Sequence, residues 1–398
     1  MPNGTGGFKG HSGLQAPDEV TNMVGSVDDT ATTLTFSPPT REGGAPITGY
    51  RVVDATDTLG SSITEPSVTF TGLTNGTEYS FRVWAINPFG YSSPADMLVT
   101  PMPAAWAFWA GGRTSASFTT DTIQRVNINN KGNTIDYGDL TTARKESAGL
   151  ASSTRGIFVG GQGDGFMPMD SNYITMSTEG NAVLFGGIGV VFDYAAGLSN
   201  STRGIIGGGD PGTPHDVIHY LTIASLGDTA DYGDLFEASA QLSAAASTTR
   251  GLFFGGNNGT GVNLDDIQQV TIASLGNAVN FGLLTQNLAF TGSCSNSTRS
   301  LTSGGVDYQS TTGIIIKQIQ FNTIASAGNA ANFGDLTTGA RSKLGNASPT
   351  RAIFGGMSAT IESVEFASLG NAVDFGDMLG TLDGTQPPGP CSSAHGGL

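Results

Sequence analysis

Apolar residues in this chain alternate with polar ones over short runs, and Gly, Asn, Asp and Ser separate the runs. No stretch keeps apolar residues at the 3.6-residue spacing of an amphipathic helix. Alternation with a period of two is typical of β-strands. The 59 glycines and the 13% of charged residues favour short strands and tight turns. We therefore predict an all-β protein, and a length of 398 residues favours two or three domains.

Residues 16–101 have the pattern of a β-sandwich. Tyr79, Phe81 and Val83 fall on one face of a predicted strand. Tyr79 follows a turn, so its hydroxyl can bond back to the turn backbone in a tyrosine corner. The segment resembles fibronectin type III domains, with Phe36 where that family commonly has tryptophan. This resemblance implies a spacer or docking module.

After residue 101 three motifs recur with the same period. A Gly-Gly doublet closes an apolar run every 47 to 51 residues, beginning at Gly111, Gly160, Gly207, Gly255, Gly304 and Gly355. A Gly-Asn/Asp-x-x-x-Phe/Tyr-Gly motif, typified by Asn181 and Phe185, also occurs six times. Thr-Arg precedes the doublet strand five times, at Arg155, Arg203, Arg250, Arg299 and Arg351. Recurrence at this period indicates a repeat fold.

Each unit contains four predicted strands, which is the size of a propeller blade. The first strand has small residues, the second ends at the doublet, and the fourth carries an aromatic such as Phe185 or Tyr232 that we expect to fill the space between blades. The units resemble kelch repeats without their usual tryptophan. For residues 102–398 the resemblance implies a six-bladed kelch-like β-propeller.

The chain ends predict how such a ring closes. The first unit begins at its second strand, and residues 388–398 look like the missing first strand. In this alignment Ser392 corresponds to Ser152. We therefore expect the C-terminal segment to pair into the first blade, which would cover two sheet edges.

Composition narrows the partners. The formal net charge is −16 with 17 basic residues and no basic cluster, so nucleic acid is not an expected partner. Residues 1–15 are Gly-rich and polar, and we predict a flexible N-terminal arm that orders on a partner. No signal-peptide pattern and no run of 18 apolar residues occurs, so we expect synthesis in a cytoplasm without membrane insertion. Cys294 and Cys391 fall in non-adjacent units, which predicts two free buried thiols.

Candidate chemistry is sparse. The histidines are scattered, and only His215 and His219 share a segment, whereas a metal site needs three or four converging ligands. The Asp-Tyr-Gly-Asp sequences at 136–139 and 231–234 occur at the same place in two repeats, so we interpret them as turn residues rather than a catalytic pair. The repeated arginines either bind acidic ligands or brace their own blades, and their recurrence favours bracing. We expect no catalytic residue, no metal and no cofactor.

The combination of a fibronectin type III domain, glycine-rich kelch-like repeats and strong acidity resembles virion surface proteins of tailed phages, especially marine ones. The resemblance implies a non-enzymatic structural and adhesion part of a tail fibre or another exterior appendage. Its expected partners are other virion proteins through the arm or the first domain, and a host-surface glycan or protein through the propeller, with a homo-oligomer possible. The alternatives are a bacterial extracellular adhesin and a polysaccharide-acting propeller enzyme.

The loops between the second and third strands vary most in this chain, while the strands around them are nearly repeated. Rigid folds commonly present binding residues in this way. The candidate binding residues are aromatic, apolar or polar groups in these loops, namely Phe166, Met167, Asp216, His219 and Tyr308.

Overall fold

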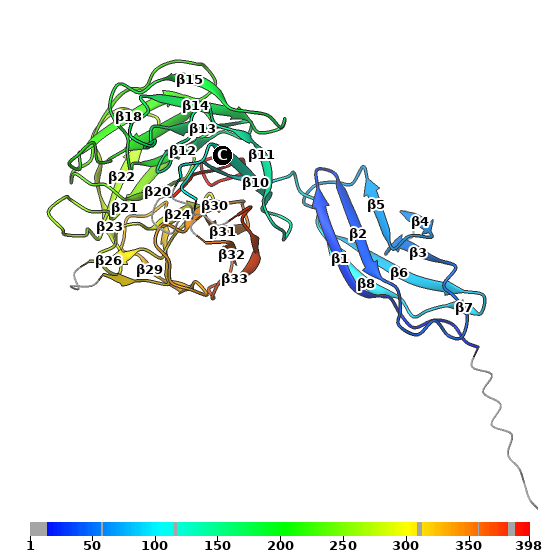
Figure 1. Ribbon diagram of the computed structural model, residues 1–398. Helices are drawn as coiled ribbons and strands as arrows, with labels where there is room; N and C mark the ends of the chain where they lie inside the picture. Colours follow the sequence, from blue (N-terminus) through cyan, green and yellow to red (C-terminus); the bar gives the residue numbers. More distant parts are fainter. Residues whose placement is uncertain (1–13, 57–58, 115–117, 309–312, 357, 381–386) are drawn as a thin grey trace, which may run out of the picture. The chain divides into compact units, whose positions relative to one another are not determined.

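The computed structural model describes residues 14–398 apart from 57–58, 115–117, 309–312, 357 and 381–386. Residues 1–13 of the predicted arm lie outside the described part. The secondary structure assigned within it consists of β-strands and turns, with no helix (Figure 1). The chain divides into two compact units between Ala104 and Ala105, and an all-β fold is confirmed.

The N-terminal unit consists of two antiparallel sheets. One has the order β1-β2-β5, and in the other β4-β3-β6-β7 are joined by β8, which pairs with β6. The strands are β1 (Thr21–Asp28), β2 (Ala31–Ser37), β3 (Gly49–Asp54), β4 (Gly60–Ile63), β5 (Ser67–Thr71), β6 (Tyr79–Asn87), β7 (Gly90–Tyr91) and β8 (Ala95–Val99).

The alternation read from the sequence sets the core of this unit. Phe81 and Val83 are buried, whereas Arg82 between them is exposed. Phe36 is buried edge-on against Tyr50, with ring centroids 4.9 Å apart, so the phenylalanine fills its position. The hydroxyl of Tyr79 accepts a hydrogen bond from the Thr74 N–H at 3.0 Å, which confirms the tyrosine corner.

The described part of the C-terminal unit contains six separate four-stranded antiparallel sheets. We call them sheets 1 to 6; the sheets themselves are open. In chain order of strands they are sheet 1, β9 (Trp106–Ala110), β10 (Thr122–Asn127) and β11 (Ile135–Asp139) with β34 (Gly389–Ser392); sheet 2, β12 (Ala148–Ala151), β13 (Arg155–Val159), β14 (Asp170–Thr175) and β15 (Val183–Gly187); and sheet 3, β16 (Ala196–Ser199), β17 (Arg203–Gly207), β18 (Val217–Thr222) and β19 (Ala230–Asp234).

Sheets 4 to 6 repeat the same plan. They are sheet 4, β20 (Ser243–Ala246), β21 (Arg250–Phe254), β22 (Asp266–Thr271) and β23 (Val279–Leu283); sheet 5, β24 (Gly292–Ser295), β25 (Arg299–Ser303), β28 (Gln318–Thr323) and β29 (Ala331–Asp335); and sheet 6, β30 (Leu344–Ala347), β31 (Arg351–Gly355), β32 (Thr360–Glu365) and β33 (Val373–Asp377). A short hairpin, β26 (Val306–Asp307) with β27 (Ile314–Ile315), extends the β25–β28 loop of sheet 5.

The C-terminal strand pairs with β9 as predicted. β34 runs antiparallel to it, with Gly389 opposite Ala110 and Ser392 opposite Ala107. The predicted alignment of Ser392 with Ser152 is wrong by one residue. The N–H groups of Ser393 and Ser152 make the equivalent bonds, to the carbonyls of Trp106 and Arg155. The slip arose because a run of serines offers two registers and only the ladder selects one.

The first strands of the six sheets contact one another in the cyclic succession β34, β12, β16, β20, β24, β30 and β34 again. The hydrophobic clusters also span neighbouring sheets. Phe185 of sheet 2 packs with Ile206 and Leu221 of sheet 3, and Tyr232 of sheet 3 packs with Phe253 of sheet 4, which confirms the predicted role of these rings.

The Asn or Asp of the Gly-Asn/Asp motif joins each sheet to the one before it. Its side-chain oxygen accepts a hydrogen bond from a backbone N–H at the end of the preceding outer strand. The six donor and acceptor pairs are Asp139 to Asn181, Gly187 to Asp228, Asp234 to Asn277, Leu283 to Asn329, Asp335 to Asn371 and Asp377 to Asn133, at 2.7–3.1 Å. The last pair links sheet 6 to sheet 1.

The second glycine of this motif permits the contact. A Cβ on Gly186 would lie 2.1 Å from the Gly227 carbonyl oxygen, and one on Gly376 would lie 2.1 Å from that of Gly132. Two backbone bonds, such as Gly180 N–H to Tyr137 O and Ala182 N–H to Asp139 O, reinforce each junction. Each outer strand edge is therefore partly covered by the next repeat.

The repeated arginines contact their own sheets and also bond to the following one. Arg155 donates to the Ile223 carbonyl of sheet 3, and Arg351 of sheet 6 donates to the Ile128 carbonyl of sheet 1. Arg203, Arg250 and Arg299 make the same bond to the following sheet. The expectation that the arginines brace their own units therefore accounts for only part of their contacts, because sequence recurrence does not tell which neighbour a long side chain reaches.

The Asp-Tyr-Gly-Asp texts are not turns. Residues 136–139 lie in β11 and residues 231–234 in β19, with their tyrosines buried. The glycine of each motif lies in a strand because only glycine allows the backbone of the next motif to come so close.

Deletion of residues 388–398 should destabilise the C-terminal unit, because it uncovers the edge of β9 and removes Cys391 from a buried cluster. We expect the melting temperature of that unit to fall by about 10 °C or more, or the protein to aggregate. Scanning calorimetry of the full and truncated chains measures this, with the N-terminal unit's transition as the internal control. An unchanged C-terminal transition would contradict the role of β34.

Candidate binding face

The five predicted binding residues lie on different sheets. Phe166 and Met167 are in the loop between β13 and β14, with 49% and 38% of their surfaces exposed. Asp216 is exposed directly before β18, and Tyr308 is half-buried after β26. His219 is not in a loop at all, because it lies in β18. The structure therefore does not bring the five into one site.

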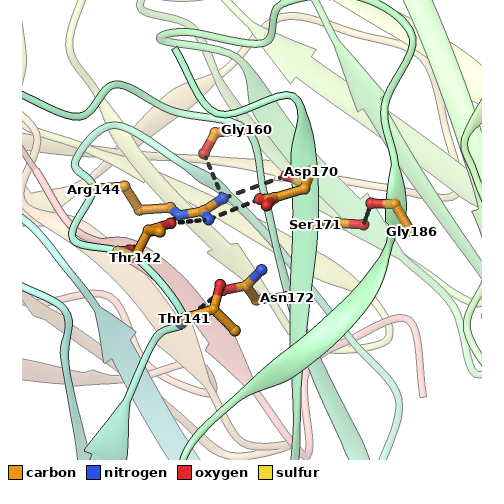
Figure 2. A network of polar contacts seen from close by, with 8 residues as sticks. All are labelled: Thr141, Thr142, Arg144, Gly160, Asp170, Ser171, Asn172 and Gly186. Carbon is orange, nitrogen blue, oxygen red and sulfur yellow. Dashed lines mark hydrogen bonds and ion pairs between the residues drawn. The ribbon is translucent and has the colours of Figure 1, made fainter. Parts of the chain in front are cut away.

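His219 occupies a repeated structural position, the third residue of the third strand. In the other five sheets, the polar side chain at this position accepts a hydrogen bond from a backbone N–H in the loop that leads to the first strand of the same sheet. The pairs are Asn172 with Thr141, Gln268 with Phe236, Gln320 with Thr285, Glu362 with Thr337 and Gln124 with Leu379, and Figure 2 shows the first. His219 instead contacts Thr229 Oγ1 at 2.9 Å and packs against Phe192, and burial lowers its pKa. These contacts explain His219 as a half-buried structural residue rather than a binding residue.

The loop that carries Phe166 and Met167 is anchored at its base. The fully buried guanidinium of Arg144 donates to the carbonyl oxygens of Gly160 and Asp170 and forms a 2.7 Å ion pair with the Asp170 carboxylate (Figure 2). These contacts hold the two ends of the loop together. Phe166 and Met167 line a surface hollow that also has Arg113 and Lys145 on its walls.

Five non-glycine residues share a left-handed backbone conformation two positions before a first strand. They are Glu146, Tyr194, Gln241, Phe290 and Ser342, with φ between 45° and 62°, and we call them the rim residues. Each such residue costs about 1–2 kcal/mol. Pro387 holds the equivalent position before β34.

Backbone bonds link several rim positions. Gln241 N–H donates to Tyr194 O, Phe290 N–H to Gln241 O, and Ser342 N–H to Phe290 O, at 2.5–2.9 Å. Glu146 N–H donates to Pro387 O at 2.6 Å. The backbone is thus the same from repeat to repeat, whereas the side chains are all different. The sequence reading missed these residues because they share no residue type.

The rim residues border a cavity of about 130 Å³ enclosed by the first strands of all six sheets. Its walls are mainly Ala, Ser, Gly and Leu, and His395 lies at the end opposite the rim. Loops between second and third strands lie on the rim side, since Gln162 exchanges backbone bonds with Lys145.

Residues 393–398 cross the end of the cavity away from the rim. Gly396 N–H donates to Ser295 O of sheet 5, and His395 Nε2 lies 3.1 Å from Ala151 O of sheet 2. A Cβ on Gly397 would lie 1.9 Å from Ser199 O of sheet 3, so glycine is required there. The C-terminal segment is therefore a plug as well as a strand.

Carboxyl groups are buried on the rim side of the cavity. Glu146 is 3% exposed, and its carboxyl lies beside the Tyr194 hydroxyl and the Asp193 carboxyl. Burial raises the pKa of Glu146 to about 8 and also raises that of Asp193, while the charge of Lys145 opposes both shifts. Both Glu146 oxygens and Asp193 Oδ1 lack a hydrogen-bond partner of normal geometry among the described residues.

Other chemistry is limited in the described part of the chain. No group of three or more His, Cys, Asp or Glu residues there is placed to hold a metal ion. Cys294 and Cys391 are free and buried as predicted, and burial raises the pKa of each thiol. Among the described residues there is no helix long and apolar enough to cross a membrane.

The C-terminal plug should weaken in acid. Nε2 of His395 faces Ala151 O, and Nδ1 accepts from Gly397 N–H at 3.1 Å, so the neutral ring fits and burial lowers its pKa to about 4. The unfolded chain binds this proton near pH 6.5, so stability is lost as pH falls from 6.5 towards 4, by about 1–3 kcal/mol. Urea unfolding should show a shallower acid slope in His395→Gln than in the original chain. Equal slopes would contradict this assignment.

Glu146 should destabilise the protein as pH rises. Its folded carboxyl keeps its proton up to about pH 8, whereas the unfolded one releases it near 4.5, so stability is lost between these values. Relative to Glu146→Gln, the original chain should lose about 2–4 kcal/mol across this range in urea unfolding. Asp136→Asn, which changes an exposed carboxylate of β11, is the control and should show no comparable slope. A parallel pH dependence of Glu146→Gln and the original chain would refute the assignment.

Comparison with known protein families adds one finding. Residues 16–100 match the sequence profile of the fibronectin type III domain. This range agrees with the two-sheet unit and includes both Phe36 and Tyr79. The N-terminal unit is therefore a fibronectin type III domain.

Proposed function

We propose that the C-terminal unit is a six-bladed kelch-like β-propeller closed by the C-terminal strand. Three observations support this. The first strands contact one another in cyclic succession, the Asn133 bond and the Arg351 bond link sheet 6 to sheet 1, and β34 completes sheet 1.

We further propose that the protein is a non-enzymatic structural and adhesion component of a phage virion, in a tail fibre or another exterior appendage. The observation that carries this proposal is the fixed backbone with variable side chains on one face. The rim residues repeat one strained conformation with five different side chains, and the adjoining loops vary in the same way. A rigid frame with one variable face is suited to recognition.

In this proposal the rim face meets a host-surface glycan or protein. The fibronectin type III domain and residues 1–15 attach the protein to other virion proteins, and a homo-oligomer is compatible with this role. The virion surface is the proposed location. The charge of −16 favours neutral or cationic partners over nucleic acid.

A polysaccharide-acting enzyme is the second candidate, because the buried carboxyl of Glu146 lines the cavity and lies beside that of Asp193. Paired carboxyls are the usual groups of glycoside hydrolysis. Release of reducing sugar from host polysaccharide, abolished in Glu146→Gln, would favour the enzyme. A bacterial extracellular adhesin would use the same recognition face but would be found on bacteria rather than in phage particles. Mass spectrometry of purified phage particles distinguishes the two.

The proposed function predicts that the full chain binds cells of the host bacterium through its rim face. Replacing both Phe166 and Met167 with Ala should weaken binding about tenfold or more, because exposed aromatic and apolar groups commonly anchor interfaces. The matched control replaces Val183 and Leu184 of the outer strand, which are 49% and 57% exposed. Cell-binding isotherms with labelled protein measure both. Equal binding by the two double variants would exclude this loop, and absence of the protein from particles would exclude the virion role.

A further inference from the structure

The cavity behind the rim has the size and chemistry of a ligand site. A buried water occupies roughly 10–15 Å³ of such volume, so about 130 Å³ accommodates about as many non-hydrogen atoms as one pyranose sugar contains. The walls combine apolar groups, such as Leu150 and Leu198, with hydroxyls. Such mixed walls match a sugar ring, which has apolar C–H faces and polar edges.

Two of the polar residues that line this space carry unpartnered side-chain atoms. Glu146 and Ser147 both line the cavity, both are more than nine-tenths buried, and neither side chain has a hydrogen-bond partner of normal geometry among the described residues. Leaving a buried acceptor unsatisfied costs about 1–3 kcal/mol. A ligand that donates hydroxyl hydrogens to these atoms would recover that cost.

The rim adds groups of the kind that hold a sugar in place. The rings of Tyr194 and Phe290 lie edge to face with centroids 5.8 Å apart, and the Phe290 ring carries the Arg341 guanidinium 4.8 Å from its centre. Gln241 supplies an amide between these two rim positions along the chain of backbone bonds. The backbone strain shared by the rim residues is of the kind found at ligand sites.

We propose that this cavity binds the terminal pyranose unit of a glycan, with its hydroxyl groups bonded to Glu146 and Ser147, which line the cavity, and its ring held at the rim. The proposal rests on the proposed function for the identity of the larger glycan, but the site itself is defined by the cavity. The plug formed by residues 393–398 makes the site one-ended. Only the end of a glycan chain then enters, not its middle.

Saturation-transfer NMR with the full chain and a panel of free hexoses, N-acetylhexosamines and hexosamines tests the site directly. At least one pyranose should give a signal. Measured at pH 9, above the pKa of Glu146, Glu146→Gln should weaken its binding tenfold or more by removing a charged acceptor. Ala244→Leu should abolish it by filling the cavity from a wall position of β20. Asp136→Asn is the matched control and should bind normally.

Two outcomes overturn the proposal, namely no signal from any pyranose with the original chain, or undiminished binding in both Glu146→Gln and Ala244→Leu. The cell-binding assay separates this result from the proposed function. If the original chain and Ala244→Leu bind cells equally, and free sugars do not compete, the adhesion role stands and this site is excluded. If the chain binds a sugar but does not bind cells, the site stands and the adhesion role is excluded.

Discussion

The C-terminal unit depends on one repeated hydrogen bond, from the backbone at the end of each outer strand to an Asn or Asp of the next sheet. It occurs at all six junctions, including that between sheet 6 and sheet 1. One such bond is worth about 1 kcal/mol, which alone would not hold a sheet. Its effect comes from position, because it fixes the outer edge of every sheet against its neighbour while the first strands pack at the other edge.

The glycine of the same motif explains why this bond can form so often. The carbonyl of one motif's first glycine comes so near the next motif's second glycine that any side chain would collide with it. Steric constraints and hydrogen bonding therefore select the same short sequence motif in every repeat. The arginine of the second strand adds a second bond to the following sheet, and it stacks on an aromatic of its own sheet, as Arg155 does on Tyr173 at 4.5 Å.

Much of this could be predicted from the sequence, because motifs that recur at a fixed period report on a repeated environment. The strands, their order within each sheet and the pairing of β34 with β9 follow from that recurrence. The rim residues could not be found in the same way. Their backbone is repeated, but Glu146, Tyr194 and Phe290 have no chemistry in common, and non-glycine residues rarely adopt positive φ.

His219 shows the opposite failure. Read alone, a histidine near a variable loop suggests binding, whereas three-dimensional alignment places it at the same position of the third strand as Asn172 and Gln268, where it bonds to Thr229. The plug was missed for a related reason. The alignment assigns all of residues 388–398 to a first strand, whereas the strand ends at Ser392 and the residues after it cross the end of the cavity.

Sheet 1 shows how the repeat adapts where the two ends of the unit meet. Trp106 occupies the position that holds arginine in the other sheets, as the equivalent bonds of Ser393 and Ser152 demonstrate. Arg125 of the adjacent strand β10 compensates, since it stacks on Trp106 at 4.5 Å and on Tyr137 at 5.2 Å and pairs with Glu179 of sheet 2. The cation between sheets 1 and 2 is thus retained although it comes from another strand. What the fold conserves at each junction is a cation held against aromatic rings, and the residue position that supplies it is free to change.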